Sequence, residues 1–238
     1  MKRQDYEKIK LYVGAMSLNC VDAVLEIPQV SKKVGFISSR RQIDYCNGYV
    51  NNWTTSEFKK YVKSKNKNIL LCRDHGGPSQ GVIKDDGIKS LLDDARHLDL
   101  NHIDPWKKYK DLEIGTQHPI QMIKKINETN NSVFFEIGTE EAIRKFSVKD
   151  LQYFLSKTKS NLIKDQFDKI VYCVVQSGVG LDLVEMKNTG NFSEKRLKEM
   201  VDICKSFGIL TKEHNSDYLK RGELLIRYDL GLDAANIA

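Results

Sequence analysis

The chain has 238 residues, of which 40% are hydrophobic, and a formal net charge of +6. It contains no run of about 18 apolar residues, so we expect no membrane-spanning helix, and the N-terminal MKRQDYEKIK lacks the apolar stretch of a secretory signal. The five cysteines are odd in number and form no CxxC pair, which favours reduced thiols and a cytoplasmic location.

The densest positive charge lies in KKYVKSKNKN, residues 59–68. Lys59, Lys60 and Lys63 fall where the pattern predicts the solvent side of a helix end, a position that lysines favour because of the helix dipole. No nucleic-acid motif accompanies them. We therefore interpret this segment as a solvated helix face and expect no nucleic-acid partner.

Short apolar segments recur along the chain, and each leads into polar residues. They cover residues 10–16, 33–38, 68–72, 98–103, 132–138, 169–175, 208–214 and 231–238. Near-continuous apolar runs are typical of parallel strands that are buried on both faces. Between them, capping patterns predict helices that begin after Thr54, Asp86, Ser147 and Ser193. Gly208 is predicted to end the last of these helices, and His118 to begin a helix before Pro119.

Eight strands that alternate with helices predict a (β/α)₈ TIM barrel in a single domain over residues 1–238. An open sheet is the alternative, but no G-x-G-x-x-G follows the first strand to support a dinucleotide-binding fold. The sequence stops at the eighth strand without a final helix. We expect that helix to be missing, or to be supplied by a partner or by a continuation of the chain, because an uncovered strand exposes apolar surface.

The chemistry of such a barrel lies at the carboxyl ends of its strands. The segments at those positions are rich in histidines, carboxylates and amides. They are residues 38–53, RDHGGPSQG (73–81), HIDPW (102–106), EIGTEE (136–141), QSGVGLD (176–182) and EHNSDY (213–218).

Four of these residues are candidate metal ligands because each arrives on its own strand: His75, His102, Glu136 and His214. A divalent ion at the barrel mouth would polarise a sugar carbonyl and stabilise an enediolate. A ligand set of imidazole nitrogens and a carboxylate oxygen suits zinc better than it suits manganese. Each histidine could instead be an ordinary hydrogen-bonded one, and a buried Glu136 could face a lysine or arginine rather than a metal.

Asp74 and Asp104 could abstract a proton or orient a ligand, although Asp74 could also cap the turn at Gly76 and Gly77. The glycines at 76, 77, 178 and 180 would admit a phosphate close to the backbone.

The cationic candidates for a substrate phosphate or carboxylate are Arg40, Arg41 and Arg73. Tyr45, Tyr49 and Trp53 could stack on a sugar, with at least one of them packed under the loop instead. Each arginine could equally lie on the surface.

The segment DHGGP (74–78) resembles the Asp-His-x-Gly-Pro signature of the family that holds the accessory subunit of class II tagatose-bisphosphate aldolase. Further segments resemble that family in the same order: QIDYCNGY (42–49), HID (102–104), EIGTE (136–140), VVQSGV (174–179) and EHNSDY (213–218). The resemblance extends from about residue 36 to 218. The chain differs in having Ser177 in place of a proline and Asn215 directly after His214, and in being shorter than typical members.

The resemblance implies a TIM barrel related to metal-dependent class II aldolases. Members of the family include a subunit that supports a separate catalytic aldolase chain, and related proteins that epimerise sugar acids with a metal. Matched position by position, it places these residues at the site: Asp74, His75, His102, Asp104, Glu136, Glu140, Gln176, His214 and Asp217.

We therefore predict a metal-dependent aldolase or epimerase that acts on a sugar phosphate or sugar acid. The predicted catalytic residues are Asp74, Asp104 and Glu140. The predicted substrate contacts are Arg41, Gln42, Tyr49, Arg73, Gln176, Asn215 and Asp217. The alternative is a non-catalytic barrel that stabilises a separate aldolase subunit, and a homo-oligomer is a further form that the protein could take.

Overall fold

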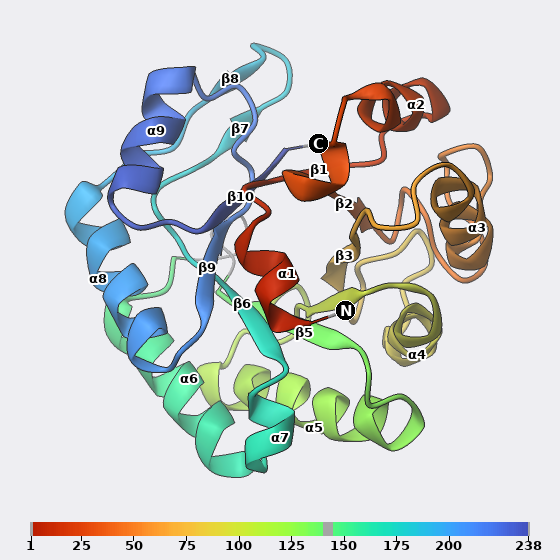
Figure 1. Cartoon of the computed structure of the whole chain (residues 1–238). Coiled ribbons are helices and arrows are strands. Elements are labelled where there is room, and N and C mark those ends of the chain that lie inside the picture. Colours follow the sequence, from red (N-terminus) through yellow and green to blue (C-terminus); the bar gives the residue numbers. More distant parts are fainter. Residues whose placement is uncertain (1, 140–144, 238) are drawn as a thin grey trace.

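A computed structural model describes residues 2–139 and 145–237, and its eight parallel strands close into a barrel (Figure 1). The strands, in spatial order, are β1 (Leu11–Val13), β10 (Ala234–Ile237), β9 (Leu210–Glu213), β6 (Ile170–Val174), β5 (Phe134–Gly138), β4 (Leu100–Ile103), β3 (Leu71–Gly76) and β2 (Val34–Ser39). The last strand pairs with the first, with Leu11 opposite Ala235. The predicted TIM barrel is confirmed, and the closure rules out the open sheet.

Helices surround the barrel, as Figure 1 shows. They are α2 (Leu18–Glu26), α3 (Thr55–Lys65), α4 (Ile88–His97), α5 (Leu112–Thr129), α6 (Val148–Asn161), α7 (Lys164–Phe167), α8 (Glu194–Ser206) and α9 (Arg221–Asp229), with a 3₁₀ turn at Val30–Lys32. A small hairpin, β7 (Leu181–Asp182) and β8 (Lys187–Asn188), lies between β6 and α8. Within the described residues, no helix combines the length and hydropathy that a bilayer crossing needs.

Three of the four predicted caps are present, whereas the N-cap of α4 is Gly87 and not Asp86, whose carboxylate accepts from the backbone of Ile88. Thr54 and Ser147 each accept a hydrogen bond from the backbone three residues on, within capping boxes. Ser193 caps α8, and Gly208 follows the end of that helix with a φ of 73°.

The predicted helix start at His118 is wrong. Helix α5 begins six residues earlier, at Leu112, where Asp111 accepts from the backbone of Ile114. Pro119 therefore lies inside the helix, where its ring would press on the carbonyl group four residues before it. That carbonyl belongs to Gly115, which itself packs against the Trp106 ring.

The lysine-rich segment belongs to the end of α3, as expected of a solvated helix terminus. Lys63 donates to the carbonyl oxygen of Ile69 and pairs with Asp99, and Lys65 pairs with Asp22. Lys59 also donates to the carbonyl oxygen of Arg96, so intramolecular partners engage three of its lysines.

The short helix α1 (Arg3–Glu7) covers the amino-terminal end of the barrel. Arg3 donates to the backbone carbonyls of Asp168 and Ile170, and the Tyr6 hydroxyl donates to that of Asp99. Tyr6 also packs edge-on against Phe134. With one end sealed in this way, the carboxyl ends of the strands form the mouth that is left for a ligand.

Candidate metal centre and cleft

Four side chains converge at the mouth of the barrel: Asp74 and His75 from β3, His102 from β4 and His214 just after β9. Each offers one ligand atom, and these atoms all lie within 4.8 Å of one another. Three of the four residues predicted as metal ligands are therefore brought together, and Asp74 joins them.

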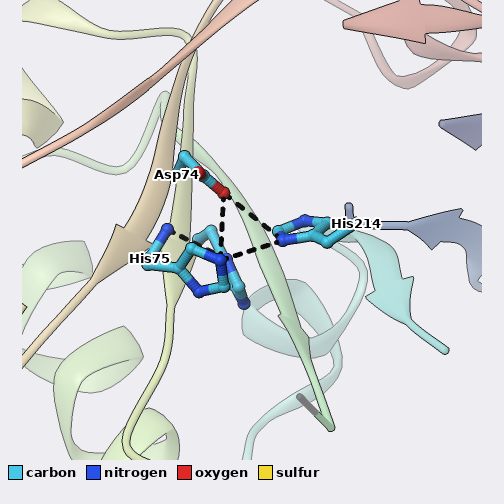
Figure 2. A group of neighbouring side chains, drawn as sticks. Asp74, His75 and His214 are labelled. Atoms are coloured by element: carbon cyan, nitrogen blue, oxygen red, sulfur yellow. Dashed lines mark hydrogen bonds and ion pairs between the residues drawn. The ribbon is translucent and has the colours of Figure 1, made fainter. Parts of the chain in front are cut away.

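Three of these atoms have spacings that match a metal site. The Nδ1 atom of His214 lies 3.3 Å from the Oδ1 atom of Asp74 and 3.4 Å from the Nε2 atom of His75. The third side of the triangle, from His75 Nε2 to Asp74 Oδ1, is 3.6 Å. Figure 2 shows these side chains pointing toward one another. A tetrahedral ion with bonds of about 2.0–2.2 Å would separate its ligands by about 3.3–3.6 Å.

Hydrogen bonds behind the site orient two of the imidazoles. The Nδ1 atom of His75 lies 2.9 Å from the Oδ2 atom of Asp104, and the Nε2 atom of His214 lies 2.7 Å from the Oε1 atom of Glu136. A carboxylate accepts the proton of the ring nitrogen that it contacts, so the other nitrogen keeps its lone pair. The nitrogen that keeps its lone pair faces the cluster in both rings: it is Nε2 in His75 and Nδ1 in His214.

Burial keeps two of the histidines neutral. His102 and His214 are both about 2% exposed, and burial lowers the pKa of each to about 3. His102 is also held by the backbone N–H of His75, which donates to its Nδ1 atom at 3.2 Å. Neutral imidazole is the form that binds a metal, so the site is prepared to do so at ordinary pH.

Asp104 is a buried support for His75. It accepts hydrogen bonds from the Gln80 amide at 2.6 Å and from the backbone of Trp106 at 3.0 Å. Burial acts to raise its pKa, but the hydrogen bond with His75, together with the electrostatic effect of the His75 and His102 rings and the hydrogen bond from the Trp106 backbone, outweighs burial and lowers the pKa to about 2. These contacts support the predicted orienting role more than the role of a base.

Glu136 lies behind His214 and is not part of the four-residue cluster. Its Oε1 atom contacts the His214 ring, and its Oε2 atom forms a buried ion pair with Lys212. A buried Glu136 requires a cation, which could be a metal or a basic side chain. The geometry favours Lys212 as that cation. Sequence reasoning missed Lys212, although its place two residues before His214 in a strand puts both side chains on one face.

The backbone around His75 is bent to aim the side chain. The residue has a positive φ of 45°, and the pairing of β3 with β4 shifts register between Arg73 and Gly76. Asn215, next to His214, has a φ of 57°. Non-glycine residues hold such values at a cost of about 1–3 kcal/mol, and these conformations cluster at functional sites.

The space beside Gly76 and Gly77 is occupied by the backbone of the segment that follows and ends β4, and so it is not open to a ligand. A Cβ atom on Gly76 would lie 2.6 Å from the carbonyl oxygen of His102, and one on Gly77 would lie 2.4 Å from that of Asp104. Gly178 is likewise closed by Asn191. The close approach is what lets β3 and β4 bring their polar ends together.

We expect Gly77→Ala to lower the free energy of unfolding by at least about 1–3 kcal/mol, because a φ of 145° disfavours any side chain and the new Cβ meets a backbone atom. Urea unfolding followed by circular dichroism measures the change. Gly222→Ala in α9 is the matched control, because no atom lies within 4 Å of its added Cβ. Equal stability of the two variants would contradict this account.

A cleft of about 490 Å³ opens above Asp74 and His75. Five of the predicted substrate contacts line it: Arg41, Gln42, Tyr49, Asn215 and Asp217. Apolar side chains that the sequence did not single out complete its wall: Met16, Val82, Leu181 and Leu183. The loop after β2, the hairpin and the segment after β9 thus meet over the candidate metal centre.

The structure places two other predicted substrate contacts away from the cleft. Arg73 is fully buried, and its guanidinium pairs with Asp94 of α4 and donates to the carbonyls of Ser38 and Ile43. Because it neighbours Asp74 in a strand, its side chain points to the opposite face of the sheet. The Gln176 side chain is buried and accepts from the backbone of Phe146.

Two other candidate residues, Arg40 and Trp53, make contacts that stabilise the fold. Arg40 is buried between Asp44 and Asp85. Trp53 packs on Phe58 under the loop, which confirms that at least one of the loop aromatics is structural. Glu140 lies outside the described residues.

No family model matches the sequence, and no curated protein sequence matches it. Solved structures are similar in fold. A protein from Sinorhizobium meliloti 1021, described as a probable tagatose 6 phosphate kinase, has a TM-score of 0.77 at 15% identity, over 96% of this chain and 64% of that one. The YdjI aldolase from Escherichia coli K12 has a TM-score of 0.68 at 12% identity, over 99% of this chain and 78% of that one.

The carboxyl transferase domain of pyruvate carboxylase from Rhizobium etli is also similar, with a TM-score of 0.64 at 11% identity, over 99% of this chain and 41% of that one. These likenesses agree with the TIM-barrel fold, which proteins of differing activity share. The chain spans less than two thirds of the Sinorhizobium protein. The finer resemblance to the accessory-subunit family stays a prediction.

Proposed function

We propose that this chain is a divalent-metal-dependent enzyme that acts next to the carbonyl group of a sugar phosphate or sugar acid, by aldol cleavage or epimerisation. The observation that supports it most is the triangle of Asp74, His75 and His214 atoms, whose sides of 3.3–3.6 Å suit a tetrahedral ion. The nitrogen-rich donor set favours zinc over manganese.

In this proposal His75, His214 and the Oδ1 atom of Asp74 hold the ion, and His102 becomes the fourth ligand once it gives up the hydrogen bond that its Nδ1 atom accepts from the His75 backbone. Bound there, the ion would polarise the substrate carbonyl and favour loss of a proton at the adjacent carbon. Asp74 belongs to the cluster and also lines the cleft, so we assign it the proton transfer. Its Oδ1 atom is buried and accepts no hydrogen bond in the described part of the chain, so we assign this oxygen to the ion and the proton transfer to Oδ2.

The cleft supports an anionic polyhydroxy substrate. Arg41 is exposed and is the only arginine or lysine among the described residues that line the cleft, so we assign it the substrate's phosphate or carboxylate. Gln42, Asn215 and Asp217 offer partners for hydroxyl groups, and Tyr49 offers a ring face to the sugar. Glu140 keeps its proposed catalytic role from the resemblance alone.

We also propose a cytoplasmic location, because all five cysteines are free thiols. A separate aldolase subunit or a second copy of the chain stays open as a partner. The non-catalytic alternative leaves the cluster of neutral imidazoles without a purpose, which favours the enzyme.

We expect the zinc-loaded protein to exchange deuterium from the solvent into the carbon next to the carbonyl of at least one sugar phosphate or sugar acid. Asp74→Asn should lower this exchange by about 10²–10⁴-fold, the usual contribution of a positioned base. Incubation of a substrate panel in D₂O, followed by NMR, measures both.

Two results separate the proposals. Exchange that Asp74→Asn leaves unchanged would exclude Asp74 as the base. If no substrate exchanges with zinc or manganese, and the chain instead raises the activity of a separate aldolase subunit even with His75 and His214 replaced by alanine, the scaffold alternative holds.

A further inference from the structure

A fully buried lysine lies inside the barrel, directly below the candidate metal centre. The Nζ atom of Lys212 lies 3.9 Å from the ring centroid of Tyr12 and 4.3 Å from that of Tyr172, and it forms an ion pair with Glu136. Both charged side chains are 0% exposed. The two rings and the carboxylate come from β1, β6 and β5, so three other strands of the barrel contribute to the surroundings of the lysine.

This lysine is costly for the fold. Branched apolar side chains usually fill the interior of a TIM barrel, and a buried ion pair is commonly no more stable than apolar residues of the same volume. Two tyrosine faces offset part of the lost hydration through cation–π attraction. Stability alone therefore gives little reason for a lysine here.

The pair reaches the metal centre through Glu136. One carboxylate oxygen pairs with Lys212, and the other lies 2.7 Å from the Nε2 atom of His214. A carboxylate oxygen lies on each side of the ring, but that of Glu136 is nearer, at 2.7 Å against 3.3 Å for Asp74, and Asp74 Oδ1 accepts no hydrogen bond in the described structure, so Nε2 carries the proton. The Nδ1 atom then presents its lone pair to the position between Asp74 and His75, which lie 3.3 and 3.4 Å away.

We propose that Lys212 is a positioning residue that holds Glu136 in place, and through it selects Nδ1 of His214 as the metal-binding nitrogen. The inference rests on the proposed metal centre. Lys212 fixes one oxygen of Glu136, which leaves the other aimed at the imidazole ring. Without the lysine, the carboxylate loses the partner that determines its orientation, and the His214 ring loses its fixed acceptor.

Two measurements on the purified chain test this role. The first is the long-range ¹H–¹⁵N spectrum of the histidine side chains in metal-free protein, which identifies the protonated nitrogen of each ring. We expect His214 to be protonated at Nε2, and protonation at Nδ1 would overturn the proposal. This readout needs no metal and no substrate.

The second is the affinity for Zn²⁺, measured by competition with a chromophoric chelator. We expect Lys212→Met to weaken binding by about 10–100-fold, the usual effect of removing a group that orients a metal ligand. Lys63→Met is the matched control, because Lys63 also pairs with a carboxylate, Asp99, but at the opposite end of the barrel. The control should bind Zn²⁺ as the unaltered chain does.

A folded Lys212→Met variant, checked by circular dichroism, that loses less than tenfold in affinity would overturn the positioning role. Should this variant not fold, Glu136→Gln carries the same test with the same threshold, because an amide cannot pair with Lys212 as a carboxylate does. Absence of Zn²⁺ binding by the unaltered chain would contradict the proposed metal centre itself, and so is distinct from failure of this inference.

Discussion

Replacing both His75 and His214 with alanine is expected to abolish zinc binding. The two imidazoles contribute two corners of the triangle with Asp74, and only His102 and Asp74 would be left in the cluster. A four-ligand zinc site binds with about 10–16 kcal/mol, so each ligand is worth about 2.5–4 kcal/mol, and the double variant should lose about 10⁴–10⁶-fold in affinity.

Isothermal titration of metal-free protein with zinc measures this loss, and the deuterium exchange proposed above should disappear with it. His97→Ala is the control, because His97 is paired with Asp93 on α4 and belongs to no metal cluster in the described structure. Zinc binding by the double variant with unchanged affinity and one ion per chain would place the metal elsewhere.

The second large effect concerns Arg73, which is buried, pairs with Asp94 and does not line the cleft. Arg73→Met leaves Asp94 buried without its partner, and removal of one member of a buried ion pair costs about 3–5 kcal/mol. For a chain of this size the melting temperature should fall by about 6–20 °C. Differential scanning calorimetry of the metal-free protein gives this change.

Arg41→Met is the matched comparison, because Arg41 is exposed and lines the cleft. It should leave the melting temperature unchanged and raise the KM for an anionic substrate. Arg73→Met should lower the melting temperature and, at temperatures where the variant is folded, leave that KM unchanged. Replacing Arg73 and Asp94 together by apolar residues should recover much of the lost stability. A stable Arg73→Met variant with a raised KM would restore the predicted substrate contact.

Much of the fold follows from local signals. The eight apolar segments match the eight barrel strands, and the caps at Thr54, Ser147 and Ser193 begin the expected helices. These features depend on residues close together in the chain, so the local sequence specifies them. The start of α5 was placed wrongly because a proline is usually a helix boundary, whereas here Asp111 provides a stronger cap seven residues before His118.

The candidate site was predictable in part for the same reason. His75 and His214 are 139 residues apart, yet each directly follows or ends an apolar strand, and the ends of parallel strands meet at one rim. The polar segments also located the residues that line the cleft, such as Arg41 and Asn215. The strand pattern alone was therefore enough to predict which residues lie at the carboxyl end of the barrel.

By itself, the sequence determined which segments become strands and which polar residues stand at their ends. Only the tertiary structure decided where each side chain points: Asp74 into the mouth and its neighbour Arg73 outward against α4, Glu136 toward Lys212, and the glycines toward β4. The physical reason is that alternate residues of a strand face opposite sides. A side chain's partners are therefore set by the register and closure of the barrel, and these involve residues far apart in the chain.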